Sequence, residues 1–188
     1  METFIESLKK LKEGDVCYAH GDHNPAHFDD AVRHDLADHG QHPYAAVITC
    51  GDSRVPPEHI FSVGLGSLFV IRNAGNVIGP FELGSAEYAA EHLGVPLILV
   101  LGHTHCGAVE STLAGGAEGH IKEITDEVRR AIGEETDPRK CEWLNARHSV
   151  SVLRGSEILS HLEREGKVRI MAAIYDIETG EVTFDEKF

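Results

Sequence analysis

Two short clusters of thiol, imidazole and carboxylate side chains stand out in this sequence. The first is Cys50-Gly-Asp52-Ser-Arg54 and the second is His103-Thr-His-Cys106. Zinc takes thiolate sulfur and imidazole nitrogen in tetrahedral geometry, and three protein ligands leave a fourth position for water or substrate. His-x-x-Cys is a short chelating spacing, because both ends of a tight turn can face one ion. Cys50, His103 and Cys106 are therefore candidate zinc ligands; a closed zinc site and a metal-free buried set are the alternatives.

Asp52 and Arg54 add a second chemical feature to the first cluster. A carboxylate two residues after a thiolate ligand can reach the same metal or the water bound to it. Arg54 can clamp that carboxylate with two hydrogen bonds. Carboxylate and hydroxide compete for the fourth position, so an arginine that draws Asp52 off the metal frees that position for hydroxide. A plain Asp–Arg pair that holds a turn is the alternative interpretation.

Apolar runs in the sequence indicate the strands and helices that must position these residues. The expected strands are 44–49, 68–71, 96–101, 167–175 and a short last one over 181–184. The expected helices are 2–12, 80–93 and a helical stretch over 120–165 that breaks near Asp137-Pro138. Apolar runs that do not alternate and are separated by helices predict an α/β fold, with a mostly parallel sheet covered on both faces. Because parallel strands place ligands at their carboxyl ends, the two clusters converge if their strands are neighbours.

Composition narrows the possible partners and compartments. The chain has 188 residues, with 17 basic against 31 acidic side chains and a formal net charge of −14. This balance disfavours nucleic acid and anionic membrane surfaces as partners. No apolar run reaches the roughly 18 residues of a spanning helix, and the start lacks a secretory signal pattern. We therefore expect a cytoplasmic protein with one domain over 1–188, composed of an N-terminal helix and histidine-rich arm (1–43) and an α/β core (44–188).

Three longer motifs together resemble the β-class carbonic anhydrases. They are Cys50-Gly-Asp-Ser-Arg-Val-Pro-Pro-Glu58, Gly64-Leu-Gly-Ser-Leu-Phe-Val-Ile-Arg-Asn-Ala-Gly-Asn76 and Gly102-His-Thr-His-Cys-Gly-Ala108. The pairing of Cys-x-Asp-x-Arg with His-x-x-Cys is the signature of that family. The similarity also takes in Gly40-Gln-His-Pro43 and Tyr175-Asp-Ile-Glu-Thr-Gly180, so that it covers nearly the whole chain.

The resemblance implies a fold, a cofactor and a reaction. The implied fold has a four-stranded parallel core sheet, to which the sequence pattern adds a short edge strand. The implied activity is that of a zinc lyase, the reversible hydration of CO₂ to bicarbonate and a proton by zinc-bound hydroxide, with one Zn²⁺ per chain. Cys50, His103 and Cys106 are the implied zinc ligands, with water or Asp52 in fourth place. Asp52 and Arg54 are the implied gating pair.

The resemblance also implies residues that bind the substrate. Gln41 matches a glutamine that hydrogen-bonds the substrate or the zinc-bound water. Phe69 and Tyr88 match aromatic positions that line an apolar CO₂ pocket, which in the family lies at a dimer interface; ordinary core packing is the alternative for both. Gly107, which directly follows the second cluster, is also expected to bind the substrate. The expected oligomeric state is a homodimer or a larger assembly of dimers.

Two other functions would use the same residues. Carbonyl sulfide and carbon disulfide are linear, apolar relatives of CO₂, so hydrolysis of either compound is one alternative. A non-catalytic module with closed zinc is the other, and it predicts Asp52 locked on the metal. His105, which lies between two candidate ligands, is either a proton relay or, as we prefer, turned away from the site. Cys17-x-x-His20 has chelating spacing but no second pair of ligands to complete a site.

Overall fold

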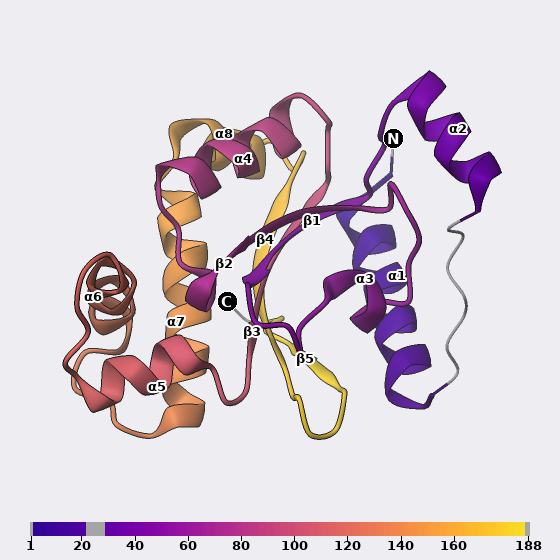
Figure 1. Cartoon of the computed structure of the whole chain (residues 1–188). Helices are drawn as coiled ribbons and strands as arrows, with labels where there is room; N and C mark the ends of the chain where they lie inside the picture. The colour runs from indigo at the N-terminus through magenta and orange to yellow at the C-terminus, as the bar shows by residue number, and fades with distance from the viewer. Residues whose placement is uncertain (1, 22–28, 187–188) are drawn as a thin grey trace.

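The computed structural model describes residues 2–21 and 29–186, and its centre is a five-stranded sheet with the order β2-β1-β3-β4-β5 (Figure 1). The parallel strands are β1 (Ala45–Cys50), β2 (Leu68–Asn73), β3 (Leu97–His103) and β4 (Arg169–Tyr175). Strand β5 (Val182–Phe184) pairs with β4 in the antiparallel direction. The predicted α/β fold, with a four-stranded parallel core and a short edge strand, is confirmed.

Helices cover both faces of this sheet. They are α1 (Phe4–Ala19), α2 (Asp30–His39), α3 (Pro57–Ile60), η1 (the 3-10 turn Ala74–Asn76), α4 (Pro80–Glu91), α5 (Gly107–Ala114), α6 (Ile121–Ile132), α7 (Pro138–Arg154) and α8 (Glu157–Arg164). Apolar side chains of α4, α7 and α8 pack on one face, and those of α1 and the α3 region pack on the other (Figure 1). Strands β1 and β3 are buried along their whole length, which explains why their sequences do not alternate. None of the described helices has the length and apolarity that crossing a membrane requires.

The N-terminal part differs from the prediction in extent. Helix α1 continues beyond residue 12 and ends at Ala19. At Gly14 it passes so close to the end of α3 that a Cβ would lie 1.8 Å from the carbonyl oxygen of Phe61, which explains the glycine at this position. Helix α2 lies inside the histidine-rich stretch and was not predicted, since it buries none of its residues and so lacks an apolar stripe. Residues 22–28 of the proposed arm lie outside the described residues.

The predicted break within 120–165 is confirmed. Asp137 accepts a hydrogen bond from the backbone N–H of Lys140, and Pro138 occupies the first turn of α7. Both features are typical of a helix start, and they separate α7 from α6. Helix α7 then runs beside β3 and β4.

Candidate metal centre

The carboxyl edge of the sheet brings three metal-binding side chains together. Cys50 ends β1, His103 ends the neighbouring β3, and Cys106 directly precedes α5. The two sulfur atoms and a ring nitrogen of His103 lie within 4.8 Å of one another, and all three residues are buried. Among the described residues this is the one group of His, Cys, Asp or Glu with such a geometry. We call Cys50, His103 and Cys106 the metal triad.

The histidine of the metal triad is oriented to bind a metal. Its Nδ1 lies 2.9 Å from the carbonyl oxygen of Thr104, and because a carbonyl can only accept, Nδ1 carries the proton. The Nε2 atom, which then holds the lone pair, is buried and has no hydrogen-bond partner. A backbone carbonyl that fixes the tautomer in this way is a common feature of metal-binding histidines.

The two thiols of the metal triad are hydrogen-bonded to each other, with Cys106 as the donor. The hydrogen bond from Cys106 lowers the pKa of Cys50, and His103 and the backbone N–H of Gly75, 3.3 Å from the sulfur, lower it further. The same hydrogen bond and burial raise the pKa of Cys106. A divalent cation between the sulfurs would hold both as thiolates. The donor set and its burial therefore fit zinc.

Asp52 faces an arginine and is not one of the clustered metal-binding groups. Arg54 donates from Nε and Nη2 to the two carboxylate oxygens at 3.0 and 2.7 Å, and its backbone N–H donates to Oδ1 at 2.9 Å. These hydrogen bonds lower the pKa of Asp52 to about 2, so the carboxylate stays ionised at neutral pH. Arg54 also donates to the carbonyl oxygen of His105 at 3.1 Å, and it thus joins the two loops that carry the metal triad.

One feature of these loops was not predicted from the sequence, and another agrees with the prediction. Arg72 of β2 donates to the carbonyl oxygens of Cys50 and Asp52 at 3.0 and 2.7 Å, and so fixes the backbone of the first cluster. His105 has a left-handed backbone with φ of 57°, and its side chain is exposed, in agreement with the preferred interpretation that it turns away. Arg72 lies in the second long motif, but nothing in its spacing indicates this contact.

The residues expected to bind substrate divide into two sets. Gly107 is exposed and directly follows the metal triad as the first residue of α5. Phe69 is paired with Ala46 near the amino end of the sheet, four residues along β1 from Cys50, or about 13 Å. The ring of Tyr88 on α4 lies 6.1 Å from that of Phe69, and Gln41 is exposed in the loop before β1. Within one chain, therefore, Gln41, Phe69 and Tyr88 lie towards the other end of the sheet.

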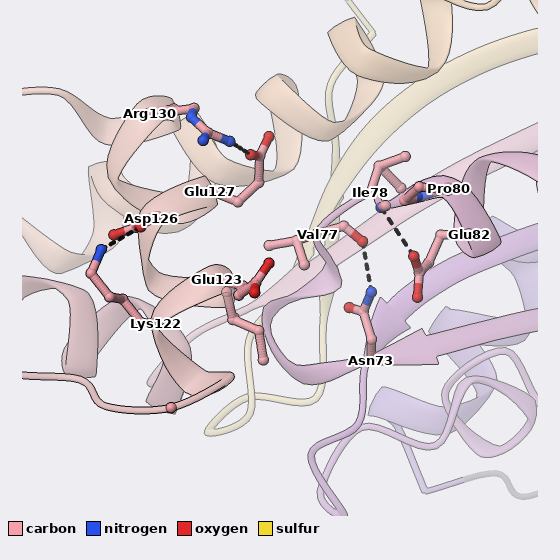
Figure 2. A pocket seen from close by; sticks show the side chains of 13 residues that line it. Asn73, Val77, Ile78, Pro80, Glu82, Lys122, Glu123, Asp126, Glu127 and Arg130 are labelled. Carbon is pink, nitrogen blue, oxygen red and sulfur yellow. Dashed lines mark hydrogen bonds and ion pairs between the residues drawn. The ribbon is translucent and has the colours of Figure 1, made fainter.

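A separate groove of about 620 Å³ lies between α6 and the segment that links β2 to α4 (Figure 2). Its α6 side carries ion pairs between Lys122 and Asp126, at 2.5 Å, and between Arg130 and Glu127. No member of the metal triad lines this groove. The charged side chains on its α6 wall do not fit an apolar ligand such as the expected substrate.

Known proteins share both the sequence and the fold of this chain. The family model for carbonic anhydrase matches residues 45–182. Carbonic anhydrase 2 of Mycobacterium tuberculosis is 36% identical over 189 residues, with 94% of this chain and 90% of that protein covered. The structure of the β-carbonic anhydrase CcaA matches 96% of this chain and 85% of its own with a TM-score of 0.72 and 31% identity. A tetrameric β-carbonic anhydrase of Sordaria macrospora matches 97% and 96% with a TM-score of 0.72 and 26% identity.

Proposed function

The chain belongs to the β-class carbonic anhydrases, zinc enzymes that interconvert CO₂ and bicarbonate, and on that premise we propose which residues carry out the reaction here. The observation that supports the assignment is the buried metal triad at the carboxyl edge of β1 and β3. Cys50, His103 and Cys106 would hold the zinc ion. Zinc bound there would act as a Lewis acid that lowers the pKa of water towards neutrality and so makes a nucleophile available for CO₂.

Asp52 and Arg54 act as a gate in this proposal. With both oxygens hydrogen-bonded to Arg54, the carboxylate is held away from the metal triad and remains an ionised acceptor. In that position Asp52 orients the attacking water by accepting a hydrogen bond from it. If the contact with Arg54 is broken, the carboxylate is free to turn towards the metal and compete with water for the fourth position.

We further propose that the working enzyme is a homodimer, or a larger assembly of dimers, in which the partner completes each site. Three observations support this assembly. Tyr88 is 46% exposed and Phe81, on the same helix, is 87% exposed, which is unusual for large apolar side chains. In the described part of the chain no strand pairs with the outer edge of β2. Phe69 lies about 13 Å along the sheet from Cys50, and the ring of Tyr88 is next to that of Phe69.

Hybrid dimers test this arrangement and the site assignment together. One chain carries Cys106→Ser, which removes a metal ligand, and the other carries Gln41→Ala, which removes the proposed partner contribution. Co-expression with two affinity tags isolates dimers that contain one chain of each kind. If the partner supplies Gln41, one site of two is complete, and the hybrid has about half the wild-type CO₂ hydration while both parent variants are weak. A hybrid no more active than the mean of its parents would show that each chain builds its own site.

Two further properties belong to the same proposal. We place the enzyme in the cytoplasm, because all four cysteines are free thiols in the structure and two of them belong to the metal triad, which oxidation would destroy. We also propose that residues 1–188 act as one catalytic domain, since two residues of the metal triad end strands of the same sheet that α1 and α7 cover on opposite faces.

A further inference from the structure

Helix α7 presents a row of buried polar side chains to η1 and to the backbone of Cys106. Glu142, Asn145 and Ser149 lie on one face of the helix, at spacings of three and four residues, and all three are buried. Glu142 accepts from the backbone N–H of Cys106 at 3.5 Å. Ser149 donates to the carbonyl oxygen of Asn76 at 2.8 Å. Each of these contacts reaches backbone rather than a side chain, so the helix fixes the course of the loops.

Asn145 makes the contact that leads to a sulfur of the metal triad. Its side-chain amide donates to the carbonyl oxygen of Gly75 at 2.8 Å. The backbone N–H of the same glycine donates to the sulfur of Cys50 at 3.3 Å. The contacts at Asn145 and Cys50 are both buried, so water does not compete with either. A continuous path of two hydrogen bonds therefore connects α7 to Cys50.

The backbone of Gly75 is held in a conformation that suits this path. Its φ of 77° and ψ of 14° lie in the left-handed region, which glycine adopts without strain. A Cβ at this position would lie 2.7 Å from the Cβ of Ala108, in the first turn of α5. Gly75 is thus enclosed by α5 on one side and Asn145 on the other, and its N–H points at the sulfur.

We propose that Asn145 is a positioning residue for the metal centre. By holding Gly75, it keeps a hydrogen bond on the sulfur of Cys50, and that hydrogen bond draws electron density from the thiolate. The charge that the sulfur donates to a bound metal is then set in part by α7. The inference rests on the proposed role of Cys50 as a metal ligand. Outer partners of this kind typically change metal affinity or activity by about 10- to 100-fold when they are removed.

The chain offers a matched control for this test. Asn145→Ala and Ser149→Ala each remove one buried hydrogen bond from α7 to a backbone carbonyl, but only the first acts on Gly75. Asn145→Leu keeps nearly the shape of asparagine without its donor, and serves if the alanine variant does not fold. Each full-length protein is loaded with Co²⁺, whose absorption contains a sulfur-to-metal charge-transfer band, and separately with Zn²⁺, whose release to a colorimetric chelator is timed.

We expect the charge-transfer band of Asn145→Ala and Asn145→Leu to move to longer wavelength, because a thiolate without the hydrogen bond gives up its electron more readily. Zinc release should become about 10- to 100-fold faster, because Gly75 and the sulfur that it orients are no longer held in place for the metal, and this loss outweighs the stronger electron donation. Ser149→Ala should lose comparable stability yet keep the wild-type band and release rate. A wild-type band and rate in both Asn145 variants would overturn the inference. A wild-type protein that shows no sulfur-to-Co²⁺ band would overturn the metal site itself, and the inference with it.

Discussion

Replacing Gly75 with alanine tests the geometry of the metal centre most strictly, because two independent features of the structure oppose a side chain there. The backbone is left-handed, with φ of 77°. The new Cβ would also lie 2.7 Å from the Cβ of Ala108, which cannot rotate away because it is fixed to the backbone of α5. Any relief must therefore come from a shift of η1 or of α5, and these elements adjoin Cys50 and Cys106 respectively.

The two effects can be given magnitudes. A left-handed backbone costs an L-residue about 1–2 kcal/mol relative to glycine. Forcing extra volume into a packed site costs a further 1–3 kcal/mol or so. The expected loss for Gly75→Ala is thus about 2–5 kcal/mol, a large part of the roughly 5–15 kcal/mol by which a typical domain is stable. For a chain of this length the loss corresponds to a fall in Tm of about 5–20 °C.

Urea unfolding of the zinc-loaded protein, followed by far-UV circular dichroism, measures this loss, and Gly166→Ala provides the matched control. Gly166 also has a positive φ, of 70°, but a Cβ there would meet no atom within 4 Å. This variant should lose only the backbone share, about 1–2 kcal/mol. If Gly75→Ala is no less stable than Gly166→Ala, the close approach of η1 to α5 is not a real constraint and the reasoning fails.

Two other predictions concern charged side chains. Arg54→Lys keeps the charge, but a lysine cannot span both oxygens of Asp52 and the carbonyl oxygen of His105. We therefore expect kcat/KM for CO₂ to fall by about 10- to 100-fold while the zinc content stays unchanged. A variant with the wild-type kcat/KM would exclude the gate. Burial raises the pKa of Asp15 from 3.8 to about 6, so the folded chain binds this proton more tightly than the unfolded chain. The protonated carboxyl group therefore contributes its full stability below about pH 4, and this contribution is lost as the pH rises through 6. In urea unfolding, Asp15→Asn should have the same free energy of unfolding as the wild type near pH 4 and be about 1–3 kcal/mol more stable at pH 8. The same difference at both pH values would show that titration of Asp15 is not the cause.

Much of the fold and the metal triad is predictable from sequence because the signals are local. Buried parallel strands need unbroken apolar runs, and β1, β3 and β4 all have them. Each reactive cluster comes at the end of such a run, so neighbouring strands are enough to bring Cys50, His103 and Cys106 together. Helix α2 escaped prediction for the opposite reason, since it has no buried side chain and hence no apolar period.

The parts of the site that sequence could not provide depend on contacts between distant segments. Asn145 is 70 positions from Gly75, and a polar residue on α7 looks in sequence like any solvated helix position. Arg72 has the same difficulty, because its partners are backbone carbonyls that any residue would offer. Gln41 and Tyr88 were recognised through resemblance alone. Tyr88 lies beside Phe69, away from Cys50, and the role proposed for both residues needs a partner copy.

The measurement that tests the central claim most directly is stopped-flow CO₂ hydration by one preparation in three states: as purified, stripped of metal by a chelator, and reloaded with Zn²⁺. Cys106→Ser, taken through the same steps, is the control. The account predicts that turnover disappears on stripping, returns in proportion to bound zinc up to one ion per chain, and stays absent in Cys106→Ser. Wild-type protein with one zinc per chain and no CO₂ hydration, or stripped protein that still turns over, would contradict it.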